Sequence, residues 1–269
     1  MGIDFRDRNI EDLYAELTEE KHPGLRELES AIYSYFDSLI LPDYPTIYDY
    51  LALSIRGRDM IATFNWDPFL IQALRRNFER VDQPRLAFLH GNVWAGFCAK
   101  DKIMGTNRTR CSQCGDVFTP SKLLYPIRQK DYASNEYIAG EWEAFRYYLR
   151  RAAFLTIFGY SAPQSDAEAI ESIKDGWGTP EQRQFEEIEI IDIRDENELR
   201  KQWAPFIHTH HYEVWDDYFD SWLAKHPRRG IDQFVEQFLE AQFIDEKPVP
   251  RDVSFDQLWA WVDELRAAE

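Results

Sequence analysis

The stretch "TFNWDPFL", residues 63–70, lies between the apolar run "MIA" and the charged run "IQALRRNFER". Residues 59–65 predict a short buried strand, and Pro68 in a first helical turn predicts a helix over 67–80. A surface turn needs only one polar residue as a helix cap, but here Asn65 and Asp67 flank a tryptophan. Two polar groups where a strand gives way to a helix indicate a strand end that faces a ligand.

Strand and helix patterns alternate along most of the chain. Helices are predicted over 9–20, 24–40, 135–151, 164–177 and 195–203. Further strands are predicted over 85–91, 121–127, 153–161 and 188–193. Largely apolar strands separated by helices are typical of a parallel sheet that is covered on both faces. We therefore expect an α/β fold, a Rossmann-like parallel sheet flanked by helices.

The chain divides into three expected segments. Residues 1–50 form an N-terminal helical segment, residues 51–200 the core with a small insertion near 95–120, and residues 201–269 an aromatic-rich, helical C-terminal segment. In the last segment His208 and His210 alternate and would share a strand face, which leaves metal binding open. Its tryptophans and tyrosines favour a role in packing or at an interface.

Composition excludes several classes of protein. The chain has 269 residues, 44% of them hydrophobic, and a formal net charge of −17 with a pI near 4.8. This charge argues against general nucleic-acid binding and binding to anionic membranes, because phosphate would be repelled, and leaves only a local basic patch open. No apolar run approaches the roughly 20 residues of a membrane span, and the acidic N-terminus is no signal peptide, so we expect a cytoplasmic protein. Three cysteines in a reducing compartment indicate metal binding, free thiols or catalysis.

Polar residues and glycines follow the predicted strands. The strand ends carry "FNWD", "HGN", "GYS" and "DIR" in chain order. In parallel sheets ligands collect at the carboxyl ends of the strands. An amide, a carboxylate, an imidazole, a glycine turn and an acidic residue are therefore expected to converge on one rim.

The order of these motifs resembles the sirtuin family. "TFNWD" is similar to its T-Q-N-x-D segment, "LHG" to its catalytic-histidine segment, "CSQCG" to half of its zinc knuckle, and "FGYSAPQSD" to the loop it places against nicotinamide adenine dinucleotide (NAD). The resemblance runs from about Asp59 to Asp195, roughly half of the chain. The "GYS" form is closest to bacterial sirtuin-like proteins, many of which cleave NAD in defence against phage.

The resemblance implies roles for individual residues. His90 would accept a proton from a ribose hydroxyl and help to expel nicotinamide, while Asn65 and Asp67 would bind the nicotinamide amide and position water. The cofactor-binding residues implied are Thr63, Phe64, Gly159, Tyr160, Ser161 and, at the ribose diol, Asp192.

Each of these residues also has a purely structural interpretation. His90 could bond a loop carbonyl, and Asp67 could cap the following helix. The "GYS" stretch could be an ordinary strand-to-helix turn, and Asp192 a solvated loop aspartate.

The three cysteines and one aspartate form a candidate zinc site. Cys111 and Cys114 are half of a knuckle, and Cys98 is a natural third ligand. The family's second C-x-x-C would end in cysteine, but here "CAKD" places Asp101 there. Zinc binding stands against a decayed site with three free thiols.

Two departures from the family concern the cofactor. The family opens with a G-A-G-x-S loop that holds the pyrophosphate, whereas Gly2, Gly24 and Gly57 are isolated and follow no clear strand. Either the chain is a truncated form of a longer gene product, or it has lost the phosphate cradle. Phe64 also stands where the family carries glutamine.

The sequence therefore predicts an NAD-binding, sirtuin-like protein that hydrolyses the nicotinamide–ribose bond of NAD. One expected biological role for this activity is defence against phage. A second hypothesis is a catalytically inactive binding or assembly module, and a third is an NAD-dependent protein deacylase. Expected partners are NAD and either further copies of the chain or a defence partner protein.

Overall fold

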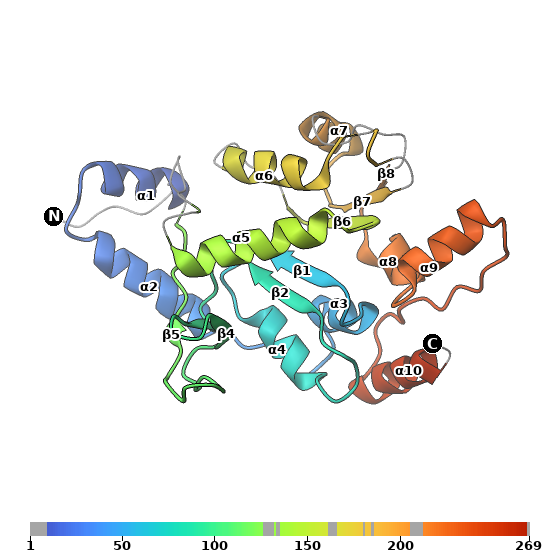
Figure 1. Cartoon of the computed structure of the whole chain (residues 1–269), viewed down its shortest axis with the longest axis horizontal. Coiled ribbons are helices and arrows are strands. Elements are labelled where there is room, and N and C mark those ends of the chain that lie inside the picture. The colour runs from blue at the N-terminus through green and yellow to red at the C-terminus, as the bar shows by residue number, and fades with distance from the viewer. Residues whose placement is uncertain are drawn as a thin grey trace.

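Helices and strands alternate along the part of the chain that the computed structural model describes, residues 10–125, 132, 135–160, 166–179, 181–183, 186–204 and 212–267 (Figure 1). The helices are α1 (Ile10–Glu19), α2 (Leu25–Asp37), α3 (Ile47–Ser54), α4 (Phe69–Arg76), α5 (Glu136–Leu149), α6 (Ala167–Trp177), α7 (Glu196–Trp203), α8 (Trp222–Lys225), α9 (Gly230–Phe234) and α10 (Phe255–Ala267). The strands are β1 (Met60–Thr63), β2 (Arg85–Phe88), β3 (Ala95–Cys98), β4 (Ile103–Thr106), β5 (Thr119–Pro120), β6 (Phe154–Phe158), β7 (Glu187–Ile191) and β8 (Tyr212–Trp215).

The strands fall into two parallel sheets and one small antiparallel sheet. β1 pairs with β2 in parallel, with Met60 opposite Arg85. β6, β7 and β8 form a second parallel sheet in that order. Helices flank both sheets (Figure 1), so the predicted α/β class is confirmed. The predicted single sheet is instead divided, because β1 and β6 share no ladder of hydrogen bonds.

Helix α5 packs on both parallel sheets. Asn135 caps its start by accepting hydrogen bonds from the backbone N–H groups of Tyr137 and Ile138. Near its middle, the indole of Trp142 donates to the carbonyl of Leu89 at 3.1 Å, just beyond β2. At its end Leu149 lies in the core of β6 and β7. The helix therefore fixes the two sheets relative to each other.

Two local predictions differ from the structure. Residues 121–125 form no strand, because Ser121 and Leu124 bond backward to the loop after β2, with Leu124 N–H donating to the carbonyl of His90 at 2.9 Å. The rest of that predicted strand, 126–127, lies outside the described residues, as do His208 and His210. Conversely, α3 and β8 form without having been predicted. No helix in the described part of the chain is both long and apolar enough to cross a membrane.

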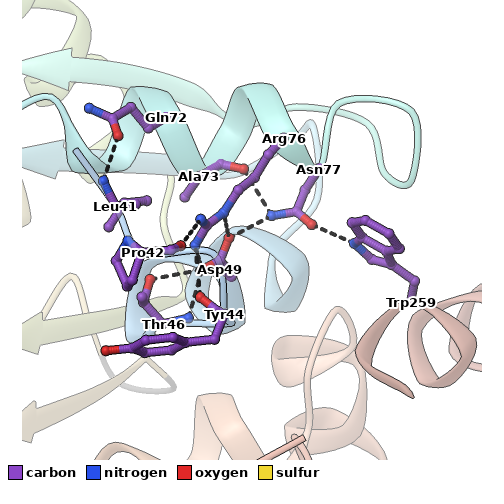
Figure 2. Close-up of polar contacts among 10 residues, drawn as sticks. All are labelled: Leu41, Pro42, Tyr44, Thr46, Asp49, Gln72, Ala73, Arg76, Asn77 and Trp259. Atoms are coloured by element: carbon purple, nitrogen blue, oxygen red, sulfur yellow. Dashed lines mark hydrogen bonds and ion pairs between the residues drawn. The ribbon is translucent and has the colours of Figure 1, made fainter. Parts of the chain in front are cut away.

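A buried carboxylate joins α3, α4 and α10 (Figure 2). Asp49 on α3 is fully buried and pairs with the guanidinium of Arg76 on α4. It also accepts a hydrogen bond from Asn77 Nδ2 at 3.0 Å, and Asn77 in turn accepts one from the indole of Trp259 on α10 at 2.8 Å. Within α3 the same carboxylate accepts from Thr46, which completes a capping box. The network fixes the C-terminal helix against the element that follows β1.

Candidate functional site

Three rings follow one another along the carboxyl ends of β2, β1 and β6. His90 lies just beyond β2, Phe64 just beyond β1 and Tyr160 just beyond β6. The ring of Phe64 lies 4.7 Å from that of His90 and is stacked on that of Tyr160 at 4.2 Å between centroids. The expected convergence of strand ends on one rim is therefore present for these three strands.

Polar groups surround the buried imidazole of His90. Its side chain is only 8% exposed, and Nε2 lies 3.9 Å from a carboxylate oxygen of Asp166. The hydroxyl of Tyr132 lies 3.4 Å from the same nitrogen. The second oxygen of Asp166 accepts a hydrogen bond from the hydroxyl of Tyr160 at 3.2 Å. A buried carboxylate beside an imidazole stabilises the protonated ring, which is the arrangement of a general base.

The tyrosines of this cluster remain protonated near neutral pH. Burial raises the pKa of Tyr160 well above its usual value, and the carboxylate of Asp166 adds to the effect. Burial likewise raises the pKa of Tyr132. Both hydroxyls therefore keep their protons and can donate hydrogen bonds.

Gly159 ends β6 in a conformation that suits glycine. Its φ of +62° lies in the left-handed region, and its N–H donates to the carbonyl of Ile191 at 2.9 Å. A Cβ built here would meet no atom within 4 Å, so only the backbone limits substitution. The turn directs Tyr160 back toward Phe64. Ser161 lies outside the described residues.

The loop after β1 holds the other predicted residues. Asn65 is exposed, and its N–H donates to Thr63 Oγ1 at 3.0 Å. Asp67 Oδ1 accepts a hydrogen bond at 3.1 Å from the N–H of Phe69, the first residue of α4. Burial raises the pKa of the Asp67 carboxyl. Asp67 therefore caps α4. It lies in the loop after β1, whereas His90 lies in the loop after β2.

Asp192 reaches the end of β7 but is already paired. Arg194 binds both of its oxygens, at 2.9 and 2.6 Å. This pairing lowers the pKa of the Asp192 carboxyl, with the hydrogen bonds from Arg194 as the main cause. A ribose diol at this position would have to share the carboxylate with the guanidinium.

Two members of the cluster were not predicted from the sequence. Asp166 stands immediately before α6, where an aspartate is expected simply as a helix cap, and Tyr132 lies in a stretch without periodicity. Each joins His90 through tertiary structure alone. The only local signal was the acidic residue that ends "GYSAPQSD".

The candidate metal ligands lie together in the antiparallel sheet of β3, β4 and β5. One ligand atom from each of Cys98, Asp101, Cys111 and Cys114 lies within 4.8 Å of all the others. Cys98 Sγ is 3.6 Å from Cys114 Sγ and 3.4 Å from Asp101 Oδ2, and Cys111 Sγ is 3.2 Å from that oxygen. The insertion thus brings together all four residues that the sequence singled out.

The donor set fits zinc. Tetrahedral zinc with Zn–S of about 2.3 Å and Zn–O of about 2.0 Å places sulfur atoms about 3.8 Å apart and sulfur about 3.5 Å from oxygen. The observed separations are close to these values. In addition, the N–H of Gln113 points to Cys111 Sγ at 3.5 Å, the kind of backbone bond that supports a metal-bound thiolate. Zinc bound here would have a structural role and not a catalytic one, because it would cross-link the insertion.

Comparison with known proteins finds likeness in structure alone. No protein-family model matches the sequence, and no curated protein matches it. A Sir2 homologue in complex with ADP-ribose has a TM-score of 0.44 and 13% identity, with 100% of this chain and 86% of that chain covered. A Sir2 homologue in complex with NAD has a TM-score of 0.41 and 14% identity, with 87% and 79% covered. A third, in complex with 2'-O-acetyl ADP-ribose, has a TM-score of 0.45 and 14% identity, with 88% and 83% covered.

Sir2 proteins are sirtuins, the same family that the sequence motifs resemble. The TM-scores and identities are low. The case for the site therefore rests on this chain's own residues.

Proposed function

We propose that this chain binds NAD at the rim beyond β1, β2 and β6 and hydrolyses its nicotinamide–ribose bond. The observation that carries the proposal is the buried imidazole of His90, with Asp166 at 3.9 Å and Tyr132 at 3.4 Å from Nε2. The order of the sequence motifs supports NAD as the ligand. A buried imidazole beside a buried carboxylate at the carboxyl ends of parallel strands is typical of a reaction centre.

The chemistry asks little of the protein beyond proton transfer and positioning. A water oxygen bonds to the anomeric carbon of the ribose, the bond from that carbon to the nicotinamide nitrogen breaks, and one proton is released. Nicotinamide leaves as a neutral molecule and needs no acid. His90 accepts the proton, and the Asp166 carboxylate stabilises the resulting imidazolium. Asn65, which is exposed in the loop after β1, binds the carboxamide of nicotinamide, and Asp67 in the same loop positions the water.

A second candidate function is a binding module without turnover. The observation that favours it is the stacking of Phe64 on Tyr160 at 4.2 Å, directly beside the imidazole. Phe64 fills the space against the imidazole at 4.7 Å between ring centroids, which leaves less room there for a nicotinamide ring. The pairing of Asp192 with Arg194 points the same way, because it removes an acceptor for the ribose.

Nicotinamide release, followed by chromatography, separates the two candidates. The parent chain is expected to release nicotinamide from NAD, and His90→Ala is expected to lose that activity by about 100-fold or more, the usual contribution of a general base. His226→Ala is the matched control, because His226 is also buried but bonds Gln233 on α9 and belongs to a different cluster of side chains. Its activity per folded chain should equal that of the parent.

Each outcome has a clear meaning. Equal activity in the His90→Ala variant would refute the assignment of the base. Binding of NAD without release by the parent chain would support the module. Absence of both would overturn the proposal. If the parent chain releases nicotinamide, we extend the proposal to anti-phage defence, as in the bacterial proteins with the same "GYS" form. Phage challenge of cells that carry the parent gene or the His90→Ala gene tests this extension.

A further inference from the structure

One face of the sheet formed by β6, β7 and β8 carries three carboxylates. Glu187 and Glu189 are two residues apart on β7 and therefore point to the same face, and Glu189 lies opposite Glu213 in the register of β7 and β8. Glu189 is fully buried, Glu187 is buried and Glu213 is exposed. Like charges on neighbouring strands of one face repel each other. Ionisation of all three carboxylates together is therefore unfavourable.

The start of α8 lies against the carboxylate of Glu189. The N–H of Trp222 donates to Oε2 at 2.8 Å, and the N–H of Leu223 donates to Oε1 at 3.4 Å. On the side of the sheet, the hydroxyl of Thr156 on β6 bonds Oε1 at 2.7 Å. These partners are all neutral, so none of them compensates the negative charge of the ionised form.

Thr156 allows Glu189 to be bonded in either protonation state, because a threonine hydroxyl can donate or accept. Burial raises the pKa of the Glu189 carboxyl to about 7; its three hydrogen bonds act in the opposite direction, and the charge of Glu213 raises it further. Burial also raises the pKa of the Glu187 carboxyl to about 7, with Glu213 adding to the effect. The charge on this face of the sheet therefore changes near neutral pH.

The elements packed on this face carry further titratable and charged groups. They are Tyr218 before α8, Lys225 and His226 at the end of α8, and Asp232 and Glu236 beyond it, which pair with Arg58 and Arg229. Burial keeps the pKa of Tyr218 well above its usual value and lowers the pKa of His226, so both are neutral above pH 7. Lys225 Nζ lies 4.5 Å from the centre of the Trp215 ring.

The segment of α8 and α9 depends on packing for its position. The two helices have four and five residues, too few to be stable alone. The ring of Trp222 on α8 stacks on that of Phe154 on β6 at 6.5 Å between centroids, and Phe234 on α9 lies 6.2 Å from the same ring. The indole of Trp222 donates to the carbonyl of Gly230 at 2.8 Å, which joins the two helices.

Two other bonds of this segment keep their charge state near neutral pH. The N–H of Val249 donates to the carbonyl of Ala224 at 2.8 Å, and Arg228 donates to Asp82 Oδ1 at 2.9 Å. Burial acts to raise the pKa of Asp82, but hydrogen bonds from Arg228 and from the N–H of Gly57 lower it below its usual value. Glu189 is thus the partner of α8 whose charge changes.

We propose that Glu189 is a pH-dependent latch that holds α8 and α9 against the face of β6 and β7. The protonated carboxyl suits the buried position. As pH rises, the proton passes to solvent, and the ionised carboxylate reaches water when α8 moves away. Because the pKa of docked Glu189 is about 7 and its usual value is 4.5, the contribution to docking is fully present below pH 4.5 and is lost as pH rises through 7. The latch does not depend on NAD.

Hydrogen exchange at single amides tests the latch. The N–H groups of Lys225 and His226 bond the carbonyls of Ser221 and Trp222, so they report the opening of α8. After correction for the intrinsic exchange rate, their exchange should rise at least about 10-fold between about pH 6 and pH 9, from the two pKa values of Glu189. They should also exchange faster than the amides of α4 at each pH. No rise, or exchange equal to that of α4, would overturn the proposal.

Charge-removing variants identify the group responsible. Glu189→Gln keeps an oxygen that accepts from α8 but cannot ionise, so the rise should fall to about 2-fold or less. Glu196→Gln is the matched control, because Glu196 is exposed on α7 and pairs with Arg200, and its rise should equal that of the parent. A full rise in Glu189→Gln would overturn the proposal.

Glu213→Gln provides a second variant that leaves the buried side chain intact. It removes the exposed charge opposite Glu189, which makes ionisation of Glu189 easier. The midpoint of the rise should therefore move to lower pH. An unchanged midpoint would contradict the repulsion between carboxylates on which the latch depends.

Discussion

Replacement of Asp49 by alanine removes the centre of the network that joins α3, α4 and α10. The carboxylate is fully buried and bonds Arg76, Asn77 and Thr46. In its absence the Arg76 guanidinium, whose side chain is 23% exposed, has no carboxylate partner among the described residues and keeps the carbonyl of Pro42 at 2.8 Å and the ring of Phe255 at 4.7 Å. Loss of one member of a buried ion pair costs about 3 to 5 kcal/mol. Partial exposure of Arg76 places the cost at about 3 kcal/mol, to which the lost capping box adds about 1 kcal/mol.

Urea unfolding followed by circular dichroism measures this cost. Asp49→Ala should lower the free energy of unfolding by about 4 kcal/mol. Adding Arg76→Leu should restore part of the loss, because the second change removes the uncompensated charge. The control is Asp263→Ala, which breaks the exposed pair with Arg80 and should cost less than about 1 kcal/mol. A loss below about 1 kcal/mol in Asp49→Ala would refute the reasoning.

Three further predictions concern metal, pH and backbone conformation. Metal analysis of protein purified without chelator should give about one zinc per chain. Cys111→Ser should lose the zinc, and Asp101→Ala should retain it more weakly, because water can replace one oxygen ligand. A metal-free parent protein would contradict the site. Burial raises the pKa of the Glu189 carboxyl from 4.5 to about 7, so the contribution of this group to stability is fully present below pH 4.5 and is lost as pH rises through 7. Glu189→Gln should flatten the fall in unfolding free energy over this range, and an unchanged slope would contradict the cause. Gly159→Ala should lower the free energy of unfolding by about 1 to 2 kcal/mol, because its φ is +62° and no atom obstructs the new methyl group. A larger loss in thermal unfolding would contradict this purely backbone cause.

Local patterns were sufficient to predict most elements near the site. The apolar periodicity of "LIQAL" after Pro68 predicts α4, whose Leu70, Ile71 and Leu74 are buried. The helix predicted over 135–151 corresponds to α5, and in the structure Asn135 caps its start. Such signals lie within a few residues of the element that they specify, so a single sequence contains them.

The division of the sheet was not predictable in the same way. Which strands pair depends on contacts between distant residues, and nothing local to "MIAT" or "FLTIF" says that these two strands do not pair with each other. α3 was missed because it is short and almost wholly apolar, although Thr46 and Asp49 form its capping box. β8 was missed because it lies in a segment dominated by aromatic residues.

The candidate site was predictable only in part. The sequence singled out His90 and the four residues of the metal cluster, and the structure brings those four together. It did not single out Asp166 or Tyr132, because their approach to the imidazole depends on where α6 and α5 pack. Roles assigned through the family resemblance remain predictions.

The most direct test of the account is the location of NAD binding by NMR spectroscopy. Titration of NAD into the labelled parent chain should shift the amide signals of Phe64, Gly159 and Tyr160 and the ring signals of His90. Binding should be weak, with a Kd of about 0.1 to 1 mM, because the described residues before Asn65 contain no glycine with positive φ that could turn the backbone around the pyrophosphate. No shift at about 5 mM NAD, or shifts confined to residues remote from His90, would contradict the central claim that this rim is the nucleotide site.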